Sequence, residues 1–233
     1  RRFIAMYGRI VLGIEGAKFE HPFDQAKKTA GVTNDAALPA AALMALCETF
    51  KAVVKVETGK EFPQDPAKQL RGAVEAVFRS WNGARAIAYR VREKISHDLG
   101  TAVNVQAMVF GNRDNNSGTG VGFTRNAATG EDKPYGDYLV NAQGEDVVAG
   151  IRNTMSLVEM SQKEPVVHAE LEKFMKSLED HYRDLCDIEF TVERAKLWIL
   201  QTRVGKRTAE AAFRIATQLV DEGKISMDEA LLR

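Results

Sequence analysis

Apolar residues recur at helical spacing through the first sixty residues of the chain. One stripe consists of Phe3, Ile4, Tyr7, Ile10, Val11 and Ile14, and a later one of Leu43, Leu46, Phe50, Val53 and Val54. Positions three and four apart lie on one face of a helix, so both stripes predict amphipathic helices. Residues 59–66 contain two prolines and predict a subdomain boundary.

The remainder of the chain mixes strand and helix patterns. Helical spacing continues over residues 67–81, over 155–183 with a break at Pro165, and over 208–221. Alternating, β-branched stretches predict strands over residues 101–110, 121–124 and 138–142. Ser226 and Glu229 have the spacing of a capping box at the start of a last helix. This order predicts an α+β fold, in which a helical part precedes a mixed, mainly antiparallel sheet with helices.

Residues 187–203 have the pattern of a β-hairpin whose turn lies at 193–196. Side chains alternate between the two faces of a strand, so Asp187 and Glu189 share one face. Gln201 and Arg203 share one face of the second strand in the same way. If the two faces coincide, the four groups suit a divalent metal and a polyphosphate, because carboxylates bind Mg²⁺ and arginine binds phosphate. The simpler alternative is an edge hairpin whose polar face is solvated.

Composition narrows the classes of function. The 233 residues are 45% hydrophobic and 27% charged, with a formal net charge of +0. A neutral chain of this kind argues against nucleic acid or an acidic membrane surface as the main partner. Cys47 and Cys186 have no metal-site spacing, no apolar run approaches a membrane span, and no signal peptide is visible. We therefore expect a cytoplasmic protein, and a start at Arg1 without Met suggests a fragment.

Three further stretches carry candidate chemistry, each with a structural alternative. The glycine-rich residues 117–123 predict either a phosphate-binding loop or a plain hairpin turn. Glu145 and Asp146 follow a predicted strand, where acids bind ribose hydroxyls or a metal, or cap a helix. Trp81 with Arg79 and Arg85 is either an aromatic site with basic neighbours or a helix end packed into a core. The four histidines support no Ser-His-Asp or Cys-His set.

Motifs along nearly the whole chain resemble the pyruvate, phosphate dikinase family. They occur in the family's order and are FPQDP (62–66), AVFRSW (76–81), GTAVNVQAMVFGN (100–112), SGTGVGFTRN (117–126), YGDYLVNAQGEDVVAGIR (135–152), HYRDLCDIEFT (181–191) and LQTRVGKRT (200–208). FRSW, NAQGEDVVAG and QTR-x-GKRT favour this family over the related phosphoenolpyruvate synthases and glucan, water dikinases.

The resemblance implies an ATP-grasp nucleotide-binding domain that holds Mg²⁺ and ATP. The family converts ATP, phosphate and pyruvate to AMP, pyrophosphate and phosphoenolpyruvate through a phosphohistidine on a separate domain, with pyruvate bound in a barrel. The implied metal and polyphosphate residues are Asp187, Glu189 and Gln201, and Arg203 would stabilise the transferring phosphoryl charge. The implied nucleotide contacts are Thr119 and Gly120 in a phosphate lid, Glu145 and Asp146 at the nucleoside, and Arg2.

The resemblance also implies a division of the chain. A helical subdomain would span 1–62, part of the first ATP-grasp lobe 63–110, the second lobe with the hairpin 111–206, and a helical linker toward the phosphohistidine domain 207–233. Residues 126–131 depart from the family pattern without touching a proposed ligand, and the departure at residues 153–154 leaves the path of the following segment open. The family's phosphate-contacting Lys and Arg and its phosphohistidine have no counterpart in this sequence, so we expect the chain alone to be inactive. The alternatives are a phosphoenolpyruvate synthase-like domain or a non-catalytic nucleotide-binding module.

Overall fold

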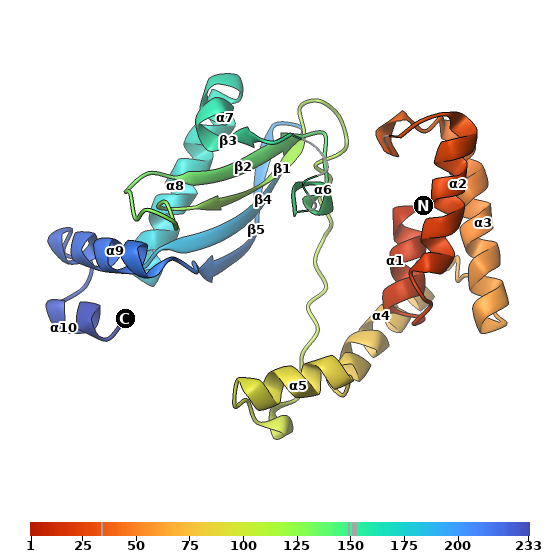
Figure 1. Ribbon diagram of the computed structural model, residues 1–233, viewed down its shortest axis with the longest axis horizontal. Helices are drawn as coiled ribbons and strands as arrows, with labels where there is room; N and C mark the ends of the chain where they lie inside the picture. The colour runs from red at the N-terminus through yellow and green to blue at the C-terminus, as the bar shows by residue number, and fades with distance from the viewer. Residues whose placement is uncertain (34, 149, 151–152) are drawn as a thin grey trace. The chain divides into compact units, whose positions relative to one another are not determined.

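The structure is a computed structural model, which describes residues 1–33, 35–148, 150 and 153–233. The chain divides into two compact units that span residues 1–106 and 107–233 (Figure 1). In the part of the chain that the structure describes, no helix is long and apolar enough to cross a membrane.

The first unit is helical, as the hydrophobic spacing predicts. It contains α1 (Arg2–Ile10), α2 (Ala17–Ala30), α3 (Ala40–Thr58), α4 (Pro66–Ser80) and α5 (Ala84–Arg92), with short 3₁₀ turns at Asp35–Ala37 and His97–Leu99. The buried core is built from Ile4, Tyr7, Ile14, Phe19, Leu46, Phe50, Val54 and Phe62. Local signals set the helix ends: Gly31 and Gly59 adopt left-handed backbone after α2 and α3, and Asp65 accepts a hydrogen bond from the Ala67 amide at the start of α4.

The FRSW segment lies at the end of α4, where Trp81 contacts Arg90 of α5. The buried Arg90 guanidinium lies 3.8 Å from the centre of the Trp81 ring. Arg90 donates hydrogen bonds to the Trp81 carbonyl at 2.6 Å and to His97 Nδ1 at 2.9 Å. The segment therefore ends α4, but Trp81 is only half-buried and packs on Arg90 rather than in the helical core.

Residues 101–110 are extended but do not form the predicted strand. A strand needs a neighbour to complete its hydrogen-bond ladder, because unpaired amides and carbonyls gain nothing from the extended form. None of the described strands pairs with this segment. The prediction was wrong because alternation reports a side-chain pattern and not the presence of a partner.

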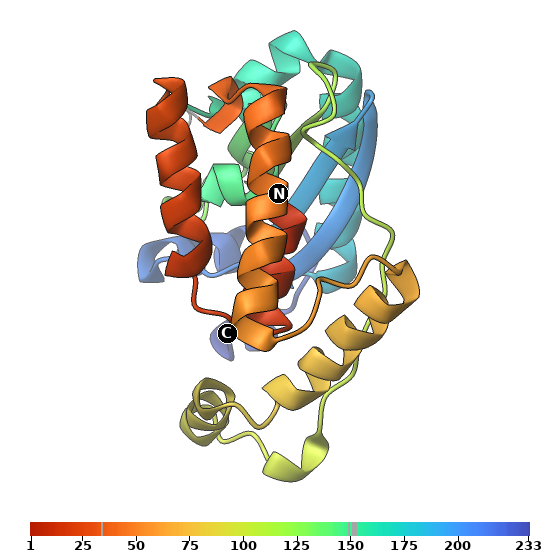
Figure 2. The same cartoon turned by 90° about the vertical axis from the view of Figure 1, so that its right-hand side faces the viewer.

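The second unit is built on a five-stranded antiparallel sheet. Its strands are β1 (Gly118–Phe123), β2 (Tyr135–Val140), β3 (Met155–Ser156), β4 (Cys186–Glu193) and β5 (Lys196–Val204), in the order β3-β2-β1-β4-β5. The helices are α6 (Gly144–Val148), α7 (Leu157–Lys163), α8 (Pro165–Tyr182), α9 (Ala209–Asp221) and α10 (Met227–Leu231). Figures 1 and 2 show α8 running along one face of the sheet, where Ile188, Phe190 and Val192 pack with Leu171 and Met175. The predicted α+β class is confirmed.

The glycine-rich stretch lies in a central strand and not in a loop. β1 begins at Gly118, three residues before the predicted strand, and pairs with both β2 and β4. Glycine is required here by close packing, because a Cβ on Gly120 would lie 2.4 Å from the Phe190 ring and 2.7 Å from the Asp137 carbonyl oxygen. The interpretation of residues 117–123 as a loop was therefore wrong.

A buried charge network ties the C-terminal helices to the rest of this unit. Arg125, only 1% exposed, donates to both oxygens of Glu179 on α8 at 3.0 and 2.6 Å and to both oxygens of Glu222 at 2.8 and 2.7 Å. Lys224 lies 2.7 Å from Glu179 Oε1. Burial alone would raise the pKa of Glu179, but hydrogen bonds from Arg125 and Lys224 outweigh it and lower the pKa to about 2.

Helices α9 and α10 belong to the second unit. Leu185, which precedes β4, shares a buried cluster with Ala211, Ile215, Leu219 and Ile225. Thr208 caps α9 by accepting from the Ala211 amide, and Ser226 and Glu229 form the predicted capping box. Residues 207–233 thus pack on the unit that carries the hairpin.

Candidate functional site

The hairpin at 186–204 forms as predicted and is held firmly at its turn. Arg194 and Ala195 make a two-residue turn with positive φ angles of 52° and 60°, the conformation that matches the twist of paired strands. The turn is anchored from the 111–117 segment, because the Ala195 amide donates to the Asn116 carbonyl at 2.8 Å and the Arg194 amide donates to Ser117 Oγ at 3.0 Å. These contacts fix the ends of the strands that carry the candidate residues.

The two predicted pairs of polar residues lie on the same face of the hairpin. Asp187 lies directly opposite Arg203, and Glu189 lies directly opposite Gln201. Arg203 Nε donates to Asp187 Oδ2 at 3.0 Å, and Arg203 Nη2 donates to Glu189 Oε1 at 2.8 Å. A single guanidinium therefore bridges both carboxylates. The condition on which the sequence-based hypothesis depended, that the two faces coincide, is met.

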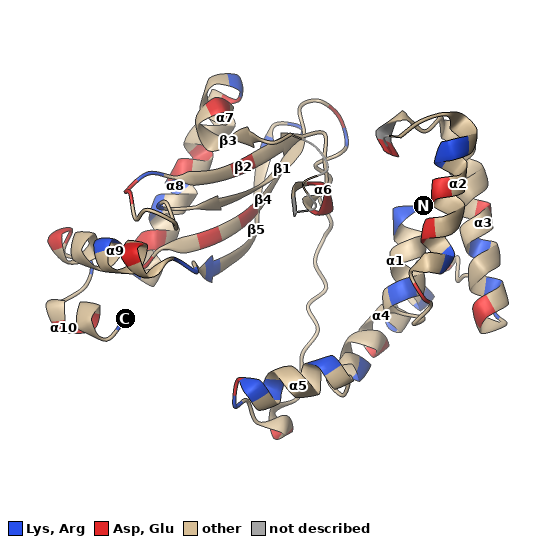
Figure 3. Cartoon of the chain, in the orientation of Figure 1, with Lys and Arg blue, Asp and Glu red and all other residues tan. Residues whose placement is uncertain are grey.

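We call this surface the polar face of the hairpin. It consists of Asp187, Glu189, Thr191 and Glu193 on β4 and Lys196, Trp198, Gln201 and Arg203 on β5. Residues of β4 between these positions are in the core, which keeps the charged side chains together on the opposite side. Figure 3 shows the acidic positions of the hairpin. The Asp187, Glu189 and Arg203 side chains are 20%, 39% and 49% exposed, so a ligand has access to all three.

A register shift separates the two halves of the polar face. Glu189 pairs with Gln201 but the next residue, Phe190, pairs with Ile199, which leaves Leu200 as the extra residue of a β-bulge. A bulge of this kind bends the strand and redirects side chains, and it is frequent beside functional sites. Without it, Gln201 would not face Glu189 while Leu197 and Ile199 remain in the core. The sequence pattern did not reveal this bulge.

The donor set fits a magnesium ion that also binds a polyphosphate. Among the described residues, no three His, Cys, Asp or Glu side chains come together as a protein-only metal site. Mg²⁺ is usually held by one or two carboxylates together with substrate phosphates, and two carboxylates facing an amide oxygen supply such a set. The Arg203 guanidinium already lies between the carboxylates, which shows that this position accepts positive charge.

Thr119 lies on the polar side of the sheet beside the hairpin. It pairs with Thr191 across the β1–β4 ladder, and the two hydroxyl oxygens are 3.3 Å apart. Thr119 Oγ1 also donates to the Phe190 carbonyl at 3.1 Å and the side chain is buried. Its neighbour Gly120 has the opposite orientation, toward the Phe190 ring. The phosphate-lid roles of Thr119 and Gly120 stay predictions.

The two acids of the NAQGED segment differ in surroundings. Both lie in the first turn of α6, which packs beside β1 and β2. Asp146 Oδ2 accepts a hydrogen bond from the Gln143 amide at 2.9 Å, so it serves as a helix cap, whereas Glu145 is exposed. Arg2 begins α1 in the other unit, and its predicted reach toward the phosphates stays a prediction.

The sequence did not reveal the buried ion pairs that hold together the segments around the hairpin. Arg125 and Glu179 are 54 residues apart in sequence, and Asp184 binds Arg207 through two contacts of 2.5 and 2.9 Å. The GKRT motif pointed to Arg207 but not to its buried carboxylate partner. Charges this far apart have no periodic signature, so only the folded chain reveals them.

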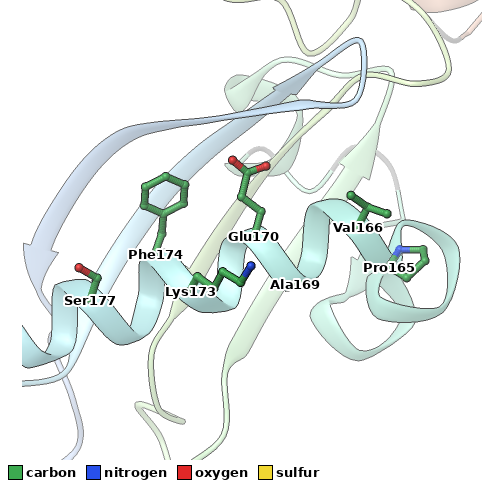
Figure 4. Close-up of a pocket in the computed structure, with 7 residues that line it drawn as sticks. All are labelled: Pro165, Val166, Ala169, Glu170, Lys173, Phe174 and Ser177. Atoms are coloured by element: carbon green, nitrogen blue, oxygen red, sulfur yellow. The ribbon is translucent and has the colours of Figure 1, made fainter.

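A hollow of about 880 Å³ lies along α8 (Figure 4), away from the four hairpin residues. Its lining is Pro165, Val166, Ala169, Glu170, Lys173, Phe174 and Ser177. All of these belong to one helix, so no groups from different elements converge there as a binding site requires. The hairpin remains the candidate site.

Comparison with known proteins shows the family to which the chain belongs. The family model "Pyruvate phosphate dikinase, AMP/ATP-binding domain" matches residues 46–172 and 158–224, and the chain belongs to this family. It is 52% identical over 234 residues to pyruvate, phosphate dikinase of Clostridium symbiosum. The aligned region covers 100% of this chain and 27% of the relative. It is 52% identical over 231 residues to the chloroplastic pyruvate, phosphate dikinase 1 of Arabidopsis thaliana, covering 99% of this chain and 24% of the relative.

The same relationship extends to a protist. Pyruvate, phosphate dikinase of Giardia intestinalis is 50% identical over 242 residues, covering 100% of this chain and 27% of the relative. The chain thus spans about a quarter of the length of the curated relatives it matches.

Proposed function

We propose that this chain supplies the ATP-holding part of a pyruvate, phosphate dikinase. In the proposed reaction, ATP, phosphate and pyruvate yield AMP, pyrophosphate and phosphoenolpyruvate by way of a phosphohistidine on another domain. The observation that carries the proposal is the register of the hairpin, which sets Asp187 opposite Arg203 and Glu189 opposite Gln201. Phosphoryl transfer depends mainly on positioning and on neutralising charge, and these four groups supply both.

In this proposal Asp187, Glu189 and Gln201 hold Mg²⁺ through oxygen atoms. The ion, when bound, neutralises charge on the phosphates and orients them for transfer. Arg203, which bonds to Asp187 and Glu189 in the structure, would bond to a phosphate when those two carboxylates hold the ion. A guanidinium suits this role because its planar donors match phosphate oxygens.

The remaining residues are proposed to bind the rest of the nucleotide. Thr119 and Gly120 would lie along the phosphates, with Thr119 in reach of the polar face through Thr191. Glu145 suits the nucleoside hydroxyls better than Asp146, because the Asp146 carboxylate already caps α6. Arg2 is proposed as a further phosphate contact.

Calorimetric titration of Mg-ATP into the chain tests the proposal. Glu189→Gln should abolish binding, because it removes a metal-ligating charge while keeping the shape of the side chain. Glu193→Gln is the matched control, since Glu193 lies on the same face of the same strand and pairs with an arginine, Arg113, at 2.9 Å. It should bind Mg-ATP like the unsubstituted chain. Equal binding by the unsubstituted chain and Glu189→Gln would contradict the proposal.

A further inference from the structure

Lys196 and Trp198 occupy the turn end of the polar face, next to the four proposed ligands. Trp198 lies opposite Thr191, and Thr191 is two residues along β4 from Glu189. Because side chains two residues apart on a strand are separated by about 7 Å, the Trp198 ring is one step away from the Glu189–Gln201 pair. Trp198 is 39% exposed on this face.

The Lys196 ammonium is held over the indole ring. Its Nζ lies 4.2 Å from the centre of the Trp198 ring, a distance at which the ring attracts a cation. Lys196 is also opposite Glu193 in the strand register, but Glu193 pairs with Arg113 from the segment before β1. The aromatic ring therefore positions the lysine in place of a carboxylate.

The carboxylates of the polar face already have cationic partners, so the Lys196 ammonium is available to an external anion. Each of the three β4 carboxylates already has an arginine: Arg203 pairs with Asp187 and Glu189, and Arg113 pairs with Glu193. No carboxylate within ion-pair distance of Lys196 is found in the described part of the chain. A cation without a carboxylate partner, held over a ring that lies one step from the proposed metal and phosphate site, is placed to bind a phosphate group.

We propose that Lys196 is a further phosphate-binding residue for the nucleotide, and that Trp198 positions it. The inference rests on the proposed function of the hairpin. A phosphate chain that binds the metal and Arg203 at one end of the polar face would extend along the strands toward the turn and meet Lys196. The ligand class is thus a linear polyphosphate, with the nucleoside making no contact with Lys196.

Titrations with Mg-ATP and with Mg-tripolyphosphate, which has no nucleoside, test this inference. Lys196→Met should weaken the binding of both ligands by the same factor, roughly tenfold, the size expected for loss of one hydrogen bond to a charged group. Lys173→Met is the control, because Lys173 lies on α8 on the other side of the sheet. It should bind both ligands like the unsubstituted chain.

The role of Trp198 is tested through the lysine. Trp198→Leu should weaken binding of both ligands, whereas Trp198→Phe, which keeps an aromatic ring, should restore most of the affinity. In the Lys196→Met background the Trp198→Leu substitution should have no further effect, since the ring acts only by holding the ammonium. An equal effect of Trp198→Leu in both backgrounds would overturn this part of the inference.

Three further outcomes separate this inference from the proposed function. If Glu189→Gln loses binding but Lys196→Met binds both ligands normally, the inference is wrong and the proposed function stands. If Lys196→Met loses affinity for Mg-ATP but not for Mg-tripolyphosphate, Lys196 contacts the nucleoside and the inference is again wrong. If Glu189→Gln binds both ligands normally, the proposed function itself fails.

Discussion

Glu179→Gln should destabilise the second unit by about 3 kcal/mol at neutral pH. The folded structure lowers the pKa of Glu179 from 4.5 to about 2. At 1.36 kcal/mol for each pKa unit, this shift corresponds to about 3 kcal/mol of preference for the charged carboxylate in the folded state. The value agrees with the about 3–5 kcal/mol expected when one partner of a buried ion pair is removed.

The same shift gives the effect a defined dependence on pH. Because the folded pKa is depressed, the contribution of Glu179 is complete above its unfolded pKa of 4.5 and is lost as the pH falls toward about 2. The difference in the free energy of unfolding between the two proteins should therefore be largest above about pH 5 and should shrink steadily below it. The neutral glutamine cannot lose a charge, so its own stability should vary less with acid.

Urea unfolding followed by tryptophan fluorescence measures this difference for the second unit alone. The chain has two tryptophans, Trp81 in the first unit and Trp198 in the second, so a Trp81→Phe background leaves a single reporter on β5. The matched control is Glu172→Gln, because Glu172 lies on the same helix but is 52% exposed, and its ion-pair contact, with His168, is a long one of 3.8 Å. The control should change stability by less than about 0.5 kcal/mol. A loss for Glu179→Gln below about 1 kcal/mol, or one that does not vary between pH 7 and pH 3, would refute the reasoning.

Three other substitutions test separate features of the second unit. Tyr138→Phe should leave stability unchanged or raise it by about 1 kcal/mol in the same urea assay. The reason is that the Tyr138 hydroxyl is buried without a hydrogen-bond partner among the described residues. A loss of stability above about 1 kcal/mol would mean that the hydroxyl has a partner. Gly120→Ala should destabilise by about 1–3 kcal/mol through overlap with the Phe190 ring and the Asp137 carbonyl. Gly144→Ala should be tolerated, because a Cβ at Gly144 would meet no other segment of the described residues within 4 Å. Equal effects of the two substitutions would contradict the packing argument. Arg203→Met should bind Mg²⁺ alone more tightly, because Asp187 and Glu189 lose their internal cation. It should bind Mg-ATP more weakly, because a phosphate contact is lost. Calorimetry that finds both affinities shifted in the same direction would contradict the proposed exchange of partners.

The features that sequence predicts well here are local ones. The helices of the first unit and α8 follow from apolar spacing, and the hairpin follows from alternation around a short polar turn. The alternation also placed Asp187 with Glu189 and Gln201 with Arg203. Residues two apart on a strand share a face however that strand is paired with its neighbour. That the two pairs meet depends on the register itself, which the Leu200 bulge adjusts.

The features that sequence missed depend on partners distant in the chain. Residues 101–110 have the composition of a strand but no described neighbour to pair with. The glycines of β1 were interpreted as a phosphate-binding loop or a hairpin turn, although Gly118 and Gly120 are required by the rings of Tyr138 and Phe190 packed against them. The Arg125 network joins three segments, and nothing in the local pattern around Arg125 indicates burial.

The most direct test of the central claim is nuclear magnetic resonance of the ¹⁵N-labelled chain with Mn²⁺-ATP, in which the paramagnetic ion replaces Mg²⁺ and broadens nearby signals. We expect the amide signals of Asp187, Glu189, Gln201 and Arg203 to broaden first, and those of Lys173 and Phe174 on the outer side of α8 to remain sharp. Glu189→Gln should remove the selective broadening. Broadening centred on any other part of the second unit, or none at the hairpin while Mn²⁺-ATP binds, would contradict the assignment of the hairpin as the metal and phosphate site.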